Sequence, residues 1–432
     1  TKASMVSFFD LAEFRTVADL AIERATLAGD RYAAADMRSW KGGVLAFRGR
    51  VNEAIAALDD AEPHVLDLAN RSVLASYRTF RAWTLAFAGN VVEARRLVDA
   101  AESAYGTGPL TSSFVALQLQ ISQLRQVDDR GWDDLEDLLA SQRRAGGGLP
   151  LVVYGMLDIL RRVDRGDVDG ALALVRELDA SPASISPMMT ILLGAPVVSV
   201  LLLAGRLDEA WARIETVEEL ARIDGGPYGL ASMGSLRSML LSDRGEVEAA
   251  EAAAHAAIGH GIDHGAVVAA RLGLLALIYA FAASDDHPGV ARLVGVLARI
   301  DDELGVHARG PLLGPRLDVA TERAVAALGR EGYDALVAEA ASLDVAGAFA
   351  YVQRTRGERR RPAHGWDSLT PTELQVVELV RQGLTNKDVA AQLLMGAETV
   401  KTHLSHIFAK VGVNNRSKLT ALATERAQQH SS

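Results

Sequence analysis

The chain has 432 residues, enough for two or three domains of about 150 residues each. It contains no cysteine, which excludes a disulfide framework, a thiol nucleophile and a Cys-ligated zinc site, and which fits a reducing compartment. Apolar residues make up 49% and aromatic residues 5% of the chain, a composition typical of a folded helical protein rich in Ala, Leu and Val. No signal peptide is visible in the first ten residues, so we expect a cytoplasmic protein.

The net charge of −10 is distributed unevenly along the chain. From Arg354 to the C-terminus there are 12 basic and 7 acidic residues, whereas the preceding residues include 33 basic and 48 acidic ones. The sequence therefore combines an acidic body, with a balance of −15, and a basic tail, with a balance of +5. Overall acidity does not exclude nucleic-acid binding by such a tail.

The body contains an internal repeat. Five segments share an apolar approach, a glycine and an alanine five residues later; the glycines are Gly49, Gly89, Gly166, Gly205 and Gly245, and the alanines are Ala54, Ala94, Ala171, Ala210 and Ala250. A weaker copy contains Gly131, which makes the period near 40 residues. We expect each glycine to end one helix in the left-handed conformation, and each alanine to lie where two helices cross closely. This period predicts an all-α solenoid of helical hairpins.

The repeat is similar to the tetratricopeptide repeat (TPR), although its spacing is longer and most consensus aromatic positions are absent. We therefore expect residues 1–352 to form a TPR-like sensor or interaction domain. The segment from Asp286 to Leu293 is expected to start a variant hairpin, and residues 329–351 to form one or two closing helices.

An uncharged stretch from Ser181 to Gly205 is long enough to cross a bilayer. Three prolines interrupt it, at positions 182, 187 and 196, and it ends at a repeat glycine. A buried helix of the array is therefore the preferred interpretation, and no membrane partner is expected. Residues 353–365 follow the body; they are rich in arginine and lack apolar periodicity, as expected of a linker.

Residues 366–432 are punctuated as four short helices. Thr370, Pro371 and Glu373 have the pattern of an N-cap, a first-turn proline and a capping-box glutamate, and Gly383 would end that helix. A second helix is expected over 386–393, begun by Thr385 with Asp388 at the capping-box spacing. A third is expected over 398–411 and a fourth, capped by Asn415, over 416 to about 428. The apolar positions that would form their shared core are Leu374, Val377, Val380, Val389, Leu393, Val400, Leu404, Ile407 and Val411.

A tight turn between the second and third helices predicts a helix-turn-helix. Its opening LTPTE, the stretch GLTNKDVA, the segment TVKTHL and the ending GVNNR resemble the LuxR/FixJ-type DNA-binding domain over roughly Trp366 to Thr424. This resemblance implies that double-stranded DNA is the partner and that the protein associates with itself on DNA. One departure is Gly396, where the family usually has a Ser or Thr cap; a glycine there costs only a few tenths of a kcal/mol, roughly.

The resemblance also assigns roles on the DNA. Lys401, Thr402 and Ser405 match the base-facing positions of the third helix, and Lys401 is a candidate donor to guanine O6 and N7. Six residues are expected to contact phosphate: Thr385, Asn386, Lys387, Thr399, His403 and Lys410. The arginines from Arg354 to Arg361 either follow the DNA backbone or belong to a solvated linker; both interpretations stay open.

The order of body, linker and reader resembles the C-terminal part of the large ATP-binding LuxR-type regulators related to the maltose regulator. Those proteins carry an NTPase module further toward the N-terminus, but this chain has no Gly-Lys dipeptide and so no Walker A loop. The helical body likewise gives no reason to expect a phosphoryl-accepting receiver or an acyl-homoserine-lactone domain.

No enzymatic function is expected. The sequence contains no nucleophile elbow and no dinucleotide fingerprint, and no cofactor is implied. His255, His260, Asp263 and His264 are the best metal candidates, but Gly259 and Gly261 are expected to interrupt the helix there, which favours an inter-helix turn over a metal site. His403 and His406 lack a third neighbouring ligand, so no metal is expected there either.

The body is instead interpreted as a binding module for an unknown effector or protein partner, held in the helical-repeat groove. Met188, Met189, Trp211 and Tyr228 are possible lining residues, although core positions are the commoner role for such side chains. We hypothesise that effector binding changes dimerisation, or releases the tail from an inhibitory contact with the acidic body. The alternative is a TPR-like interaction scaffold whose helix-turn-helix docks partners and not DNA.

Overall fold

The computed structural model describes residues 11–105, 132–144, 149–180, 186–306, 309–343, 347–352, 366, 369, 371–381, 383–392, 400–401, 404, 407–408 and 410–429. The linker expected over 353–365 and the weaker repeat glycine, Gly131, lie outside these residues. The chain divides into two compact units, residues 1–349 and 350–432. All regular secondary structure in the described ranges is helical, which confirms the all-α prediction.

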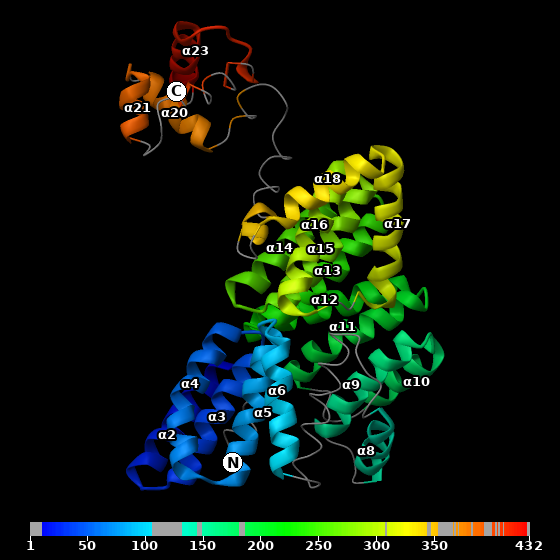
Figure 1. Cartoon of the computed structure of the whole chain (residues 1–432). Helices are drawn as coiled ribbons and strands as arrows, with labels where there is room; N and C mark the ends of the chain where they lie inside the picture. The colour runs from blue at the N-terminus through cyan, green and yellow to red at the C-terminus, as the bar shows by residue number, and fades with distance from the viewer. Residues whose placement is uncertain are drawn as a thin grey trace. The chain divides into compact units, whose positions relative to one another are not determined.

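The described residues of the first unit form helices, most of them joined to the next by a short turn (Figure 1). Its named helices are α2 (Leu11–Leu27), α3 (Arg31–Phe47), α4 (Val51–Leu68), α5 (Arg71–Phe87), α6 (Val91–Tyr105), α8 (Trp132–Arg144), α9 (Leu149–Asp164), α10 (Val168–Asp179), α11 (Pro187–Leu203), α12 (Leu207–Asp224), α13 (Pro227–Asp243), α14 (Val247–Asp263), α15 (Val267–Ala283), α16 (His287–Leu304), α17 (Gly310–Leu328) and α18 (Arg330–Ala341). Each helix contacts the next from α2 to α6 and again from α8 to α18, as in a hairpin solenoid.

The repeat predicted from the sequence is confirmed at its turns and crossings. All five repeat glycines have φ between +71° and +87°, so each ends the first helix of its pair in the left-handed region. The five alanines that follow them are completely buried. Their small side chains allow the helices of a pair to approach closely.

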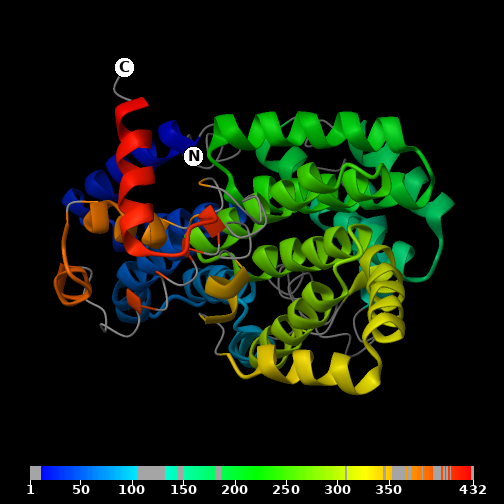
Figure 2. The same cartoon turned by 90° about the horizontal axis from the view of Figure 1, so that it is seen from above.

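The array also closes on itself, which the repeat did not predict. Helix α5 contacts α15, and α9 contacts α17. The turn after α3 meets the start of α13, where Arg48 accepts a backbone hydrogen bond from Tyr228 at 3.2 Å and the Arg50 Nε donates to the Gly225 carbonyl at 2.9 Å. The view in Figure 2 shows the blue N-terminal helices beside the green ones of the middle of the chain. A core cluster that includes Trp83, Phe87 and Ala269 lies along this junction.

The uncharged stretch forms a buried helix, as predicted. Helix α11 begins at Pro187, after Ser186, whose hydroxyl accepts a hydrogen bond from the Met189 amide at 3.2 Å. Most of its side chains are buried against the neighbouring helices, including Met188 and Met189. Across the described ranges, none of the helices combines the length and apolar character that a bilayer crossing requires.

The interruption expected at Gly259 and Gly261 is wrong, because α14 continues through both glycines to Asp263. The reason is a close contact between helices: a Cβ on Gly261 would come within 2.6 Å of the Ala270 nitrogen of α15. Gly261 therefore permits packing and does not break the helix. Among the described residues, no group of three or more His, Asp and Glu is placed to hold a metal ion.

The closing part of the body follows the predicted order. Asp286 caps α16, accepting a hydrogen bond from the Gly289 amide at 2.9 Å, and Asp285 takes the left-handed position that glycine holds elsewhere, with φ of 55°. Helix α18 and a short helical segment over 347–352 then form the two closing helices.

Candidate nucleic-acid interface

The second unit has a core of its own, built from four helical segments. Helices α20 (Pro371–Arg381), α21 (Asn386–Gln392) and α23 (Arg416–Gln429) are joined by a third helical segment, whose described residues lie between 400 and 411. Its buried apolar residues are Leu369, Val376, Val377, Val380, Val389, Ala390, Val400, Leu404, Ile407, Leu419 and Ala423. The predicted four-helix arrangement is therefore confirmed for the described residues, and Leu393 lies outside them.

The prediction that Leu374 lies in the core is wrong. Leu374 is 47% exposed, whereas Val376 is buried. The buried face of α20 runs through Glu373, Val376, Val377 and Val380, and a residue directly after Glu373 projects about 100° away from that position. Apolar spacing alone did not distinguish Leu374 from Val376, since Leu374 lies three residues before Val377 and Val376 lies four residues before Val380, and both are helical intervals.

A reciprocal cap begins α21, as the sequence predicted. The Asp388 amide donates to the Thr385 Oγ1 at 3.3 Å, and the Asp388 carboxylate accepts from the Thr385 amide at 3.1 Å and from its hydroxyl at 2.6 Å. These hydrogen bonds, the one from the Thr385 hydroxyl above all, lower the pKa of Asp388. The cap fixes the chain where it enters the helix-turn-helix.

Arg416 connects α23 to the start of α21, a role that the sequence analysis missed. Its guanidinium donates to the Asn386 Oδ1 at 2.9 Å and also bonds the Leu384 carbonyl. The Asn-Arg pair at 415–416 was noted as a motif, but its contacts 30 and 32 residues earlier depend on the tertiary fold. Asn386, predicted to contact phosphate, therefore has a partner inside the domain.

Lys410 is also engaged inside the unit. Its ammonium donates to both carboxylate oxygens of Glu373, at 2.7 and 3.0 Å, and Glu373 is only 3% exposed. A carboxylate on the buried face of α20 requires a cation, since an unpaired buried charge is costly. Glu373 thus joins α20 to the third helix; its predicted partner in the capping box, Thr370, lies outside the described residues.

Of the other residues predicted to contact DNA, some are described by the structure and some are not. Lys401, Lys387 and Thr385 have exposed side chains. Lys401 directly follows the buried Val400 and precedes the buried Leu404, which puts it on the outer side of the third helix. Four predicted contact residues lie outside the described residues: Thr399, Thr402, His403 and Ser405. The structure therefore offers a cationic outer face at Lys401, supported by a packed inner face.

Comparison with known families identifies the class of this unit. Residues 367–423 match the family model of bacterial regulatory proteins, luxR family. The C-terminal unit is thus a helix-turn-helix domain of the luxR family, as the motifs predicted. No solved structure matches the chain.

The similar proteins are regulators. A protein described as an HTH-type transcriptional regulator of Mycobacterium tuberculosis is 37% identical over 211 residues, which cover 44% of this chain and 22% of that protein. The DNA-binding transcriptional activator DevR/DosR of the same species is 35% identical over 85 residues, covering 19% of this chain and 38% of that protein. The monoamine regulon transcriptional regulator of Klebsiella aerogenes is 49% identical over 53 residues, covering 12% of this chain and 23% of that protein.

The first of these matches is longer than the C-terminal unit, because 44% of the chain exceeds the residues from 350 to 432. The similarity therefore includes part of the helical body. This chain spans about a fifth of the length of that relative.

Proposed function

We propose that this protein is a sequence-specific, DNA-binding transcriptional regulator whose third C-terminal helix enters the major groove. The observation that carries the proposal is the position of Lys401. It is exposed on a helix whose buried side, formed by Val400, Leu404 and Ile407, packs in the core of a luxR-family helix-turn-helix. A helix held this way presents a cation to a groove without losing its own packing.

Base reading is assigned to Lys401, Thr402 and Ser405. In sequence, Thr402 follows Lys401 directly and Ser405 comes one helical turn later, the spacing of residues that share one side of a helix. A lysine can donate to guanine O6 and N7, and hydroxyls can donate to or accept from several base edges. These three residues would supply the sequence preference.

Phosphate binding is assigned to residues at the start of α21 and around the third helix. Thr385 and Lys387 are exposed and polar, which supports backbone contacts by both. Thr399 and His403 are proposed on the resemblance alone. Asn386 and Lys410 would have to contact phosphate alongside the bonds they make to Arg416 and Glu373.

The test is fluorescence anisotropy of the whole chain with duplexes selected from a random pool and with scrambled duplexes, over a salt series. Lys401→Ala should weaken binding to the selected duplex by about 1–3 kcal/mol, or roughly fivefold to more than a hundredfold. The difference in affinity between the selected and the scrambled duplex should therefore become smaller. Lys387→Ala should instead weaken binding to both duplexes alike and reduce the salt slope by about one.

Lys418→Ala is the matched control, because Lys418 is an exposed lysine of the same unit to which no DNA contact is assigned. An equal loss in Lys401→Ala and Lys418→Ala would show a general charge effect and contradict base reading by Lys401. Absence of any sequence preference would favour the scaffold alternative, in which the helix-turn-helix docks a protein.

The body is proposed to sense an effector or a protein partner and to control the reader. Its opposite charge to the tail, −15 against +5, supports control by electrostatic contact, and two readers would engage half-sites about 34–36 Å apart. If residues 366–432, which have their own core, and the whole chain bound one operator equally at every salt concentration, inhibition by the body would be excluded.

A further inference from the structure

A cavity of about 270 Å³ lies within the first unit, where the array closes on itself. Parts of α5, α9, α11, α13, α15 and α17 form its wall, and Phe87 and Ala269 belong both to this wall and to the core cluster along the junction. Folded proteins contain few voids larger than a water molecule, because their interiors are closely packed. A cavity of this size is therefore a candidate site for a small molecule.

Small side chains on three of these helices leave the space open. Ala86 of α5, Ala195 of α11 and Ala269 of α15 all line the cavity. Ala86 and Ala269 are buried, and Ala195 is partly exposed. An alanine side chain ends at Cβ, so a larger residue at any of these positions would extend into the cavity. The alanines of the wall thus set the size of the molecule that fits.

The polar side chains of the wall offer a ligand little free hydrogen-bonding capacity. The hydroxyls of Ser199 and Ser235 each donate to the carbonyl four residues earlier, at 2.8 Å. The side chains of Tyr228 and Ser232, one helical turn apart on α13, interact with each other. Most of the other lining residues are aliphatic. Such a wall resembles that of an apolar cavity of about 150 Å³ that stays dry and holds benzene.

The charged residues of the wall favour neither sign of ligand charge. Arg271 is buried and makes a two-point contact with Asp301. Asp164 and Arg309 are exposed, so they mark the opening of the cavity between the end of α9 and the start of α17. One acid and one base leave no net charge at this opening. A charged ligand would lose its hydration in the apolar interior, which favours an uncharged one.

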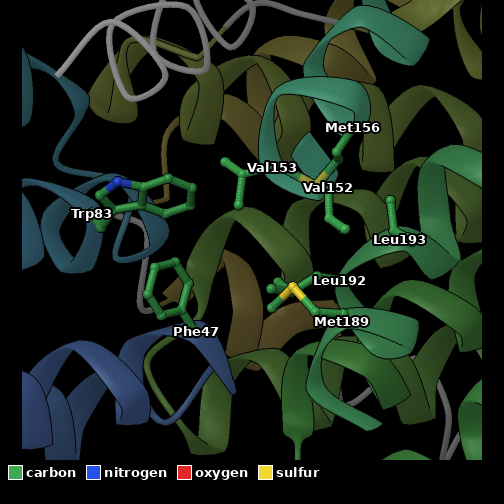
Figure 3. Close-up of a pocket in the computed structure, with 8 residues that line it drawn as sticks. All are labelled: Phe47, Trp83, Val152, Val153, Met156, Met189, Leu192 and Leu193. Carbon is green, nitrogen blue, oxygen red and sulfur yellow. The ribbon is translucent and has the colours of Figure 1, made fainter. Parts of the chain in front are cut away.

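A small pocket of about 10 Å³ adjoins the cavity through a shared residue, Met156 (Figure 3). Phe47 and Trp83 form one side of this pocket, and aliphatic residues and methionines of α9 and α11 form the other. Because methionine side chains are flexible, a rotation of Met156 would join the pocket to the cavity and lengthen the apolar space.

We propose that this cavity binds a small, uncharged, apolar molecule. Since about 150 Å³ holds benzene, 270 Å³ has room for about ten non-hydrogen atoms. The inference rests on the proposed function in one respect, because it gives the sensing body its class of effector. A ligand in the cavity contacts α5 on one side of the junction and α15 on the other, so it stabilises the closed array.

The probe is naphthalene, an uncharged molecule with ten carbon atoms, dialysed to equilibrium against the whole chain without DNA. We expect saturable binding and a midpoint of thermal unfolding that rises with naphthalene concentration. The anion 2-naphthoate and the cation 2-naphthylmethylammonium should each bind about tenfold more weakly, or less. Binding of either ion as tight as that of naphthalene would contradict an uncharged ligand.

Ala195→Phe fills the cavity from α11 and should weaken naphthalene binding about tenfold or more, while circular dichroism stays helical. Ala212→Phe is the matched control, because it makes the same substitution at an exposed alanine of α12 that is not among the lining residues. The control should bind naphthalene like the unmodified chain. Equal affinities of the two variants would overturn the proposal.

Met156→Ala is a second test, which adds no bulk to the core. Met156 lines both the cavity and the small pocket, so its truncation should make room for a longer molecule. The affinity for biphenyl relative to naphthalene should rise about fourfold, as expected for one further buried methylene group. An unchanged ratio of the two affinities would contradict binding in this cavity, even if Ala195→Phe failed to fold.

No saturable binding of naphthalene by the unmodified chain would also overturn the proposal. DNA binding is measured separately on the same preparations. Retained sequence preference on DNA without naphthalene binding would refute the effector site alone, whereas naphthalene binding without sequence preference would refute the proposed DNA function alone.

Discussion

Arg48 and Asp224 form an ion pair in the interior of the first unit, although 176 residues separate them in the chain. The Arg48 Nε lies 2.7 Å from one carboxylate oxygen of Asp224, and the second guanidinium contact is 3.0 Å. Both side chains are at most 2% exposed. The pair joins the turn after α3 to the end of α12 and so holds the array closed.

We predict that Arg48→Met lowers the free energy of unfolding by about 3–5 kcal/mol, because it leaves the Asp224 carboxylate buried without its cation. The double variant Arg48→Met with Asp224→Leu should recover much of that loss. Thermal and urea unfolding, followed by circular dichroism, would measure both. Arg206→Met, which breaks the exposed pair with Glu209, should cost less than about 1 kcal/mol. Equal losses in the two single variants would contradict a special role for Arg48.

Two repeat glycines should differ in their tolerance of alanine. Gly49 and Gly205 both have a left-handed backbone, with φ of +80° and +71°. A Cβ on Gly205 would meet open space, whereas one on Gly49 would come within 2.7 Å of the Tyr228 backbone nitrogen. Gly205→Ala should therefore cost only the conformational strain, about 1–2 kcal/mol, and Gly49→Ala clearly more. Equal unfolding midpoints for Gly49→Ala and Gly205→Ala would show that α13 and the Gly49 turn can move apart at little cost in free energy.

Lys410→Met should destabilise the C-terminal unit by about 2 kcal/mol, since Glu373 would lose its cation while staying buried. Hydrogen exchange in the whole chain should then become faster in α20. Lys387→Met, at an exposed position of α21, is the control and should leave exchange unchanged. If exchange in Lys410→Met stayed normal while DNA affinity fell, the main role of Lys410 would be phosphate binding.

The stability of the body should fall as the pH drops below about 6.5. Burial lowers the pKa of His260, and the neighbouring His264 lowers it further. Between the folded-state pKa and the unfolded value of about 6.5, the unfolded chain binds more protons, so acid favours unfolding there. His260→Gln should flatten this part of a plot of unfolding free energy against pH. His64→Gln, at an exposed histidine, should leave the slope in place.

Local signals in the sequence were sufficient for the helices and their turns. The repeat glycines and alanines, the cap formed by Thr385 and Asp388, and the capping of α23 by Asn415 all act over five residues or fewer. Such interactions depend on backbone geometry and side-chain type, both of which are visible in sequence. Leu374 and Gly261 were misjudged because each is decided by what packs against it: the face of α20 that turns inward, and the approach of α15.

The candidate interface also combines features that the sequence predicts with contacts that depend on the tertiary fold. Its motif, and with it the luxR-family helix-turn-helix, followed from the order of residues in the sequence, and most of the apolar positions predicted from that motif are buried among the described residues. The engagement of Lys410 by Glu373 and of Asn386 by Arg416 required the fold, since these contacts span 37 and 30 residues.

The all-α hairpin array, the acidic body with its basic tail, and the family of the C-terminal unit could all be predicted from the order of the residues. The closure of the array through Arg48 and Asp224, and the cavity that this closure leaves between the helices, are visible only in the folded chain. The two groups of features differ in the distance along the chain over which their interactions act. Caps, turns and helical periods are set within a few residues, whereas closure depends on small changes of angle summed over many hairpins, which no local pattern specifies.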